Sequence, residues 1–192
     1  MSAVRIHIGL TGAMASGKGE AVAVLEQLGF KYVSLSDIVR EQAAQLQGSV
    51  DRAAMQKIGN ELRRRGGAGV LGGMIRELIN SATEKKWVID GIRNPAEVNE
   101  LRLLPSFFLI GVAADREVIL ARMRSRSRPG DPFDEVAACL VLVREWGQDQ
   151  PEDGQQVGRC LEMADFIISN NDSLEEFRAA VRRLAISLEK EQ

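Results

Sequence analysis

The sequence predicts an α/β protein built on a five-stranded, mostly parallel sheet with helices on both faces. Short apolar runs alternate along the chain with helical patterns, which is typical of parallel sheets. A glycine-rich turn joins the first apolar run to the first helical pattern. Polar residues follow the carboxyl ends of the first three runs, where open sheets of this kind bind ligands.

Length and composition agree with one domain over residues 1–192. A chain of 192 residues can bury a sizeable core, and we find no linker, repeat or low-complexity tract. The net charge of −2 argues against broad nucleic-acid binding. Cys139 and Cys160 fit no metal-ligand spacing and are predicted to be reduced packing residues. We see no signal peptide and no run long enough to span a membrane, so we expect a cytoplasmic protein.

Five apolar runs are predicted as strands, at residues 4–10, 31–35, 87–90, 107–112 and 166–168. Helical patterns occupy residues 18–28, 36–47, 51–65, 70–82, 115–123, 135–145 and 155–163, and two more begin at Asn94 and at Asp172 or Ser173. Gly29 ends the first helix as a C-cap glycine does. Asn94, Pro95 and Glu97 form a strong helix start, with an N-cap, a proline in the first turn and a glutamate at the third helical position.

The turn after the first strand carries the G-x-x-x-x-G-K pattern of a phosphate-binding P-loop. A strand precedes it and a helix follows, the context that separates a real P-loop from a chance match. The glycines let several N–H groups point inward, and phosphate oxygens meet them at the positive end of the following helix. Lys18 adds a mobile positive charge for the outer phosphates, so the predicted ligand is a nucleoside triphosphate. We take ATP as the predicted cofactor, although the loop does not distinguish ATP from GTP. The predicted nucleotide-binding residues are Gly12, Ala13, Met14, Ala15, Ser16, Gly17, Lys18, Gly19 and Glu20.

The residues after the lysine depart from the usual pattern. Most P-loops place Ser or Thr there to hold Mg²⁺, whereas this chain has Gly19 and Glu20. The Glu20 carboxylate either holds the ion, directly or through water, or is an ordinary first-turn helix carboxylate. Asp90, at the end of the third strand, is the second candidate magnesium ligand.

Two further loops resemble those of the nucleoside monophosphate kinase branch of P-loop proteins. Residues 34–40, Ser-Leu-Ser-Asp-Ile-Val-Arg, resemble the adenylate kinase segment Thr-Gly-Asp-Met-Leu-Arg. Residues 90–93, Asp-Gly-Ile-Arg, resemble the family's Asp-Gly-Phe-Pro-Arg, with the arginine one residue early. The resemblance implies a three-layer P-loop sandwich with an acceptor-binding helical region at 36–82. It also implies that Arg40 and Arg93 grip an acceptor phosphate, with Ser36, Asp37 and Arg63 beside them.

The resemblance extends to the rest of the chain. Arg122 and Arg126 resemble the arginine pair that flanks the kinase lid and contacts the transferring phosphates, which places a short arginine-rich lid at 122–134. Residues 164–171 and the helix after them resemble the end of dephospho-coenzyme A kinases. The chain is also similar to an archaeal group of adenylate-kinase-related proteins and to the P-loop domain fused to some deoxycytidylate deaminases. The zinc deaminase signature is absent, and the only histidine, His7, lies inside the first strand.

These motifs lead to a hypothesis of an ATP- and Mg²⁺-dependent phosphotransferase. Lys18, Asp90, Arg122 and Arg126 are the predicted catalytic residues, and the acceptor is a small monophosphate, foremost a nucleoside or deoxynucleoside monophosphate. Dephospho-coenzyme A kinase is an alternative. A non-catalytic nucleotide-binding regulatory module is another, favoured by Glu20 and opposed by the set of arginines. We expect neither a nucleic-acid nor a membrane partner, and a homo-oligomer is compatible with the sequence.

Overall fold

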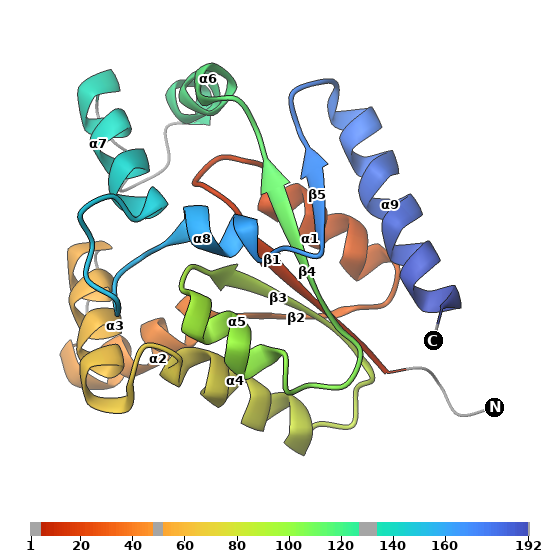
Figure 1. The fold of residues 1–192 in the computed structure, drawn as a ribbon, viewed down its shortest axis with the longest axis horizontal. Helices are drawn as coiled ribbons and strands as arrows, with labels where there is room; N and C mark the ends of the chain where they lie inside the picture. Colours follow the sequence, from red (N-terminus) through yellow and green to blue (C-terminus); the bar gives the residue numbers. More distant parts are fainter. Residues whose placement is uncertain (1–4, 48–51, 127–133, 192) are drawn as a thin grey trace.

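A computed structural model describes residues 5–47, 52–126 and 134–191 (Figure 1). Its sheet has five strands in the order β2-β3-β1-β4-β5, and every neighbouring pair is parallel. The strands are β1 (Ile6–Thr11), β2 (Lys31–Ser34), β3 (Lys86–Ile92), β4 (Phe107–Ala113) and β5 (Phe166–Ser169). The predicted α/β class, strand number and parallel pairing are confirmed.

Helices cover both faces of this sheet. The first helices along the chain are α1 (Lys18–Gln27), α2 (Leu35–Gln47), α3 (Arg52–Gly66), α4 (Val70–Ser81) and α5 (Pro95–Leu101). They are followed by α6 (Arg116–Arg126), α7 (Glu135–Trp146), α8 (Val157–Glu162) and α9 (Leu174–Lys190). Figure 1 shows α1 and α9 on one side of the sheet and α2, α4 and α5 on the other. No helix in the described part of the chain is long and apolar enough to cross a membrane.

Two hydrophobic clusters follow from the alternation of side chains along the strands. Ile6, Ile8 and Leu10 of β1 face α1 and α9, where they pack with Leu25 and Phe177. On the other face, Ile89 and Ile92 of β3 pack against α2, α4 and α5. Because β1 is the central strand, all six of its residues are buried. The sheet therefore holds the carboxyl end of β1, where the P-loop starts, in a rigid setting.

A third, smaller cluster joins α6 and α7 to the P-loop. Ile119 and Met123 of α6 and Ala138 of α7 are buried together, and the P-loop residues Ala13 and Met14 pack against them. Figure 1 shows α6 and α7 at the end of the molecule toward which the strand arrowheads point. This arrangement brings the helices on either side of residues 127–133 to the P-loop.

One boundary differs from the sequence prediction in a way that affects the site. The third strand was expected to end at Asp90, but β3 continues to Ile92, so Asp90 lies inside the strand and pairs with Ser34 of β2. Gly91 has a φ of 83°, and the pairing of β1 with β3 shifts register between Gly9 and Thr11. A register shift of this kind re-aims side chains at a strand end, and on β3 it falls between Ile89 and Ile92, the stretch that contains Asp90.

Candidate active site

The P-loop links β1 to α1 through backbone conformations that only some residues tolerate. Gly12 and Gly17 have φ values of 145° and 112°, and Ala15 has a φ of 61°. A side chain at position 17 would also collide with Asn170, whose Nδ2 lies 2.0 Å from where a Cβ would stand. Position 17 therefore requires glycine on two independent grounds. The left-handed Ala15 is a strained residue of the kind found at ligand-binding loops.

Lys18, the first residue of α1, spans the P-loop. Its Nζ donates to the carbonyl oxygen of Gly12 at 2.7 Å and to that of Ala13 at 2.9 Å. The ammonium group thus lies over the start of the loop. Among the described residues, nothing beyond Gly19's own neighbours in α1 lies within 4 Å of where a Cβ at that position would stand, so the loop is uncrowded beside the lysine. A positive charge in this position suits the outer phosphates of a nucleotide.

Arg122 and Asn170 contact the P-loop close to its end, at Ser16. The Nδ2 of Asn170 donates to the Ser16 carbonyl oxygen at 2.7 Å. Arg122 of α6 donates through one nitrogen to the Asn170 carbonyl oxygen at 2.9 Å, and through the other to the Ser16 carbonyl oxygen at 3.5 Å. The Arg122 guanidinium therefore lies at the P-loop, and its contact with the transferring phosphates stays a prediction. Its partner Asn170, just beyond β5, was not predicted as a site residue.

Glu145 contacts the P-loop close to its start, at Met14, and pairs with Arg93. Glu145 accepts a hydrogen bond from the Met14 backbone N–H at 2.8 Å through Oε2, and its Oε1 lies 3.0 Å from the guanidinium of Arg93. Arg93 also donates to Gln155 at 3.3 Å, and its carbonyl oxygen accepts from the Gln156 N–H at 2.7 Å. The predicted Arg93 thus lies at the site, but a carboxylate of its own chain engages it.

Asp90 and Ser16 each bury an oxygen without a hydrogen-bond partner among the described residues, the Asp90 Oδ1 and the Ser16 Oγ. Buried polar atoms are normally paired, so an orphan marks a place where a ligand or an ordered water belongs. A carboxylate oxygen suits a hard divalent cation, and Mg²⁺ keeps several of its waters in kinase sites. Asp90 therefore fits a magnesium role. No group of three or more His, Cys, Asp or Glu that could hold a metal occurs within residues 5–47, 52–126 and 134–191.

Glu20 is engaged on the outside of α1. Its Oε2 lies 2.6 Å from one guanidinium nitrogen of Arg178 in α9 and accepts from the Nε at 3.1 Å. Both side chains are nearly half exposed. The structure therefore gives Glu20 a cationic partner other than a metal ion, and its magnesium role stays a prediction.

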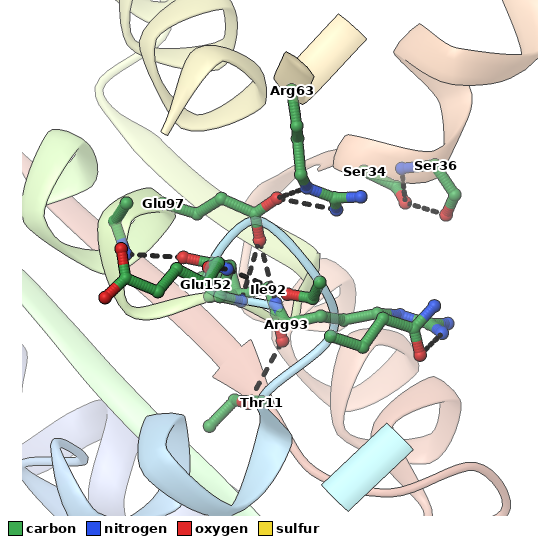
Figure 2. A network of polar contacts seen from close by, with 12 residues as sticks. Thr11, Ser34, Ser36, Arg63, Ile92, Arg93, Glu97 and Glu152 are labelled. Carbon is green, nitrogen blue, oxygen red and sulfur yellow. Dashed lines mark hydrogen bonds and ion pairs between the residues drawn. The ribbon is translucent and has the colours of Figure 1, made fainter. Parts of the chain in front are cut away.

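Arg63 forms a buried ion pair with a carboxylate, an interaction that the sequence did not predict. Its guanidinium lies against Glu97 of α5 (Figure 2). Its Nε and one terminal nitrogen donate to the Glu97 Oε1 at 3.1 and 2.8 Å. The other carboxylate oxygen of Glu97 accepts from the backbone N–H groups of Arg93 and Asn94. Glu97 is fully buried and thereby joins α3 to the chain that leaves β3.

The remaining acceptor candidates lie around the end of β2. Ser34 and Ser36 share a hydrogen bond between their hydroxyl oxygens at 2.7 Å (Figure 2). Asp37 and Arg40 form an exposed ion pair one helical turn apart. Ser34 is paired in register with Asp90, so the two predicted acceptor loops are neighbours. Of the lid, residues 127–133 and the side chain of Arg126 lie outside the described part of the chain.

Sequence reasoning missed the residues that hold the site together. Glu97 did carry a signal, because the predicted capping box is present and directs its carboxylate toward the Asn94 backbone. Gln155 and Gln156, which contact Arg93, were predicted only as the start of a helical pattern. For Glu145 the sequence offers only a charged residue near the end of a helical pattern.

Two titratable groups beneath the site have shifted pKa values. Burial raises the pKa of Cys160 to about 12, and the nearby Glu97 carboxylate adds to this shift. The thiol therefore stays protonated, and the prediction of a reduced packing residue agrees with its complete burial. Burial also raises the pKa of Tyr32 in β2.

Known proteins resemble this chain along most of its length. A family model described as an AAA domain matches residues 11–138. A UPF0200 protein from Methanoregula boonei is 32% identical over 185 residues, covering 96% of this chain and 98% of the relative. Two solved structures share the fold: shikimate kinase from Bacteroides thetaiotaomicron has a TM-score of 0.60 at 15% identity, and dephospho-CoA kinase from Campylobacter jejuni has 0.54 at 18%. The first alignment covers 97% of this chain and 99% of that one, and the second covers 96% and 97%.

These likenesses have different weight. At such low identities the two structures establish the fold alone, and that fold is P-loop kinase-like, as the motifs predict. The sequence matches identify the family of this chain. They do not single out adenylate kinases, to which two of its loops were compared. Because the family model matches more than half of the chain and the relative matches nearly all of it, the chain belongs to the AAA domain family and to the UPF0200 protein family.

Proposed function

We propose that this protein is an ATP-dependent phosphotransferase acting on a nucleoside or deoxynucleoside monophosphate. The observation that carries the proposal is the gathering of charged side chains at the P-loop and on the strand beside it. Lys18 spans the P-loop, and Arg122 contacts the loop at Ser16. Glu145 contacts the loop at Met14 and pairs with Arg93. Asp90, on the strand next to β1, buries an oxygen without a partner among the described residues.

The donor side of the proposed reaction depends on charge and position more than on covalent chemistry. Lys18 and the loop amides would hold the outer phosphates of ATP. Arg122 and Arg126 would neutralise charge on the transferring group and help to exclude water. Asp90 would hold Mg²⁺ through water, and the ion would supply charge neutralisation between donor phosphates. Glu20 pairs with Arg178, and a role in holding Mg²⁺ would require it to exchange that partner for the ion.

The acceptor side is proposed from Arg93 and Arg40, with Ser36 and Asp37 beside Arg40. Arg93 is one-third exposed, so its guanidinium can face a ligand while it keeps its carboxylate partner. Arg40 is well exposed and would exchange its pairing with Asp37 for a phosphate. Arg63 would act indirectly, because Glu97 engages it and also accepts from the Arg93 backbone.

A regulatory nucleotide-binding module is the second candidate. The observation that favours it is the pairing of Glu20 with Arg178, in a loop that has Gly19 where most P-loops offer a hydroxyl to magnesium. Such a module would bind a nucleoside triphosphate and transfer nothing.

A coupled assay of ADP formation separates the two candidates. The protein is incubated with ATP, Mg²⁺ and single ribo- or deoxynucleoside monophosphates, and dephospho-coenzyme A is included as a third acceptor class. A kinase gives acceptor-dependent ADP that Lys18→Ala abolishes, while Lys31→Ala, an exposed lysine of β2, leaves it unchanged. Nucleotide binding without turnover on any acceptor would refute the kinase in favour of the module.

A further inference from the structure

Glu145 is buried in a helix that exposes several of its large apolar side chains. Val136, Leu140 and Trp146 of α7 are more than half exposed, whereas Glu145 is 3% exposed. This is the reverse of the usual pattern for a surface helix. Burying a carboxylate is unfavourable unless charges and hydrogen bonds compensate for the lost water. The position therefore requires an explanation in terms of what the carboxylate contacts.

The partners of this carboxylate come from two separate parts of the site. One oxygen accepts from the Met14 N–H of the P-loop, and the other pairs with the Arg93 guanidinium beyond the end of β3. Met14 and Arg93 are far apart in sequence, and α7 lies on the other side of residues 127–133 from α6. A single buried group therefore connects the nucleotide-binding loop to the proposed acceptor arginine.

The surroundings of Arg93 strengthen this connection. The segment after α7 binds the same residue twice, through the Gln155 side chain and the Gln156 backbone. Arg93 is thus held at its guanidinium and at its backbone by one continuous stretch of chain, from Glu145 to Gln156. A long, flexible side chain held in this way has lost most of its conformational freedom before any ligand binds.

We propose that Glu145 is a positioning residue that couples the P-loop to Arg93. Its carboxylate fixes the Arg93 guanidinium beside Met14, so that occupation of the loop by ATP and occupation of Arg93 by an acceptor phosphate affect each other. The proposal rests on the proposed function for the identity of the two ligands. It requires Glu145 to be ionised and to touch both partners, but to make no contact with the reacting atoms.

Glu145→Gln is the sharpest test, because it keeps the size of the side chain and removes the charge. The amide has one acceptor oxygen and would turn an N–H₂ group toward one of two donors, so it loses one of the two contacts. The matched control is Glu135→Gln, on the same helix, whose carboxylate forms an exposed pair with Arg124. Thermal unfolding of each variant reports whether it is folded.

The first readout is binding. The Kd of the monophosphate that the protein binds best is measured with and without a non-hydrolysable ATP analogue. We expect the two values to differ by at least about 5-fold in the wild type and Glu135→Gln, and by less than about 2-fold in Glu145→Gln. Equal coupling in the wild type and Glu145→Gln, or no coupling in the wild type, would overturn the proposal.

The second readout is turnover. We expect Glu145→Gln to lower kcat by on the order of 10–100-fold, because a misplaced arginine costs that much, while the Kd for ATP stays within about 3-fold. Arg93→Ala combined with Glu145→Gln is expected to lose no more than the worse single variant. Losses that multiply would contradict a shared role. An absence of wild-type turnover with intact coupling would instead refute the kinase and leave the coupling by Glu145 standing.

Discussion

At the scale of single residues, Glu97 and Arg63 form the most completely buried ion pair described in the structure. Their side chains are 0% and 8% exposed, and Glu97 also accepts from two backbone N–H groups. Arg64, the next residue, pairs with Glu61 on the outer face of α3 with its side chain 68% exposed. Two adjacent arginines in one run of three therefore have opposite environments. Which of them is buried depends on the face that α3 turns toward the rest of the protein.

This contrast predicts different effects on stability. Arg63→Ala leaves the Glu97 charge buried without its partner and is expected to lower the free energy of unfolding by about 3–5 kcal/mol. Arg64→Ala removes an exposed pair and should change it by less than about 1 kcal/mol. Urea denaturation of both variants measures the difference. A loss of acceptor affinity in Arg63→Ala at unchanged stability would show that Arg63 is a direct ligand instead.

His7 is the only histidine of the chain, so its titration can be followed without ambiguity. It is 1% exposed, and its Nδ1 lies 2.6 Å from the Pro105 carbonyl oxygen. Burial lowers the pKa of His7 below 6.5. The folded protein then binds the proton less readily than the unfolded chain, so His7 contributes stability that falls as the pH drops below about 6.5.

The measurement is an NMR pH titration of the single imidazole. We expect a midpoint below 6.5 and a smaller loss of stability on acidification in His7→Gln than in the wild type. A midpoint at or above 6.5 would contradict the buried neutral ring.

At the scale of elements, α9 is fixed to α1 mainly by apolar contacts. Phe177, Val181, Ala185 and Leu188 are buried against the sheet and α1. The same interface carries the exposed pair between Glu20 and Arg178. Because exposed pairs contribute little and buried aromatic side chains contribute much, the apolar residues decide the docking of α9.

Phe177 and Arg178 are neighbours in α9 and make a matched comparison. Phe177→Ala is expected to cost about 3–5 kcal/mol in the free energy of unfolding, because it leaves a cavity in the core. Arg178→Ala should cost less than about 1 kcal/mol. Chemical denaturation checks both values, and similar costs would mean that the ion pair contributes more to docking than its exposure indicates.

At the scale of the whole molecule, the core beneath the P-loop contains a thiol that resists ionisation. Burial raises the pKa of Cys160 to about 12 from an ordinary value of 9.0. Between these pH values the unfolded chain has lost the proton and the folded protein keeps it. Stability therefore falls with rising pH across this window, by up to about 1.4 kcal/mol per pH unit from this group.

Cys160→Ala isolates this contribution, since other groups titrate in both proteins. The variant is expected to be less stable at pH 7, because the substitution leaves a small cavity, but its stability should fall less steeply above pH 9. Unfolding curves recorded from pH 8 to pH 11 provide the test. Parallel pH profiles for the two proteins would mean that the folded thiol ionises at an ordinary pH.

The helix and strand pattern was largely predictable because it rests on local features. The apolar runs, the P-loop glycines and the capping box at Asn94 each predict a structure from a few neighbouring residues, and all are present. The boundary at Asp90 was wrong because a register shift between β1 and β3 extends β3 to Ile92. Such a shift depends on a partner strand about eighty residues away.

By itself the sequence determined the parallel α/β fold, the place of the P-loop and the group of loops at the carboxyl ends of the strands. These follow from hydrophobic periodicity and from backbone conformations that glycine permits. Only the tertiary structure decided the partners of the charged residues: Arg178 for Glu20, Glu97 for Arg63 and Glu145 for Arg93. An ion pair joins side chains that distant elements bring together, and no local pattern records which carboxylate will lie beside which arginine.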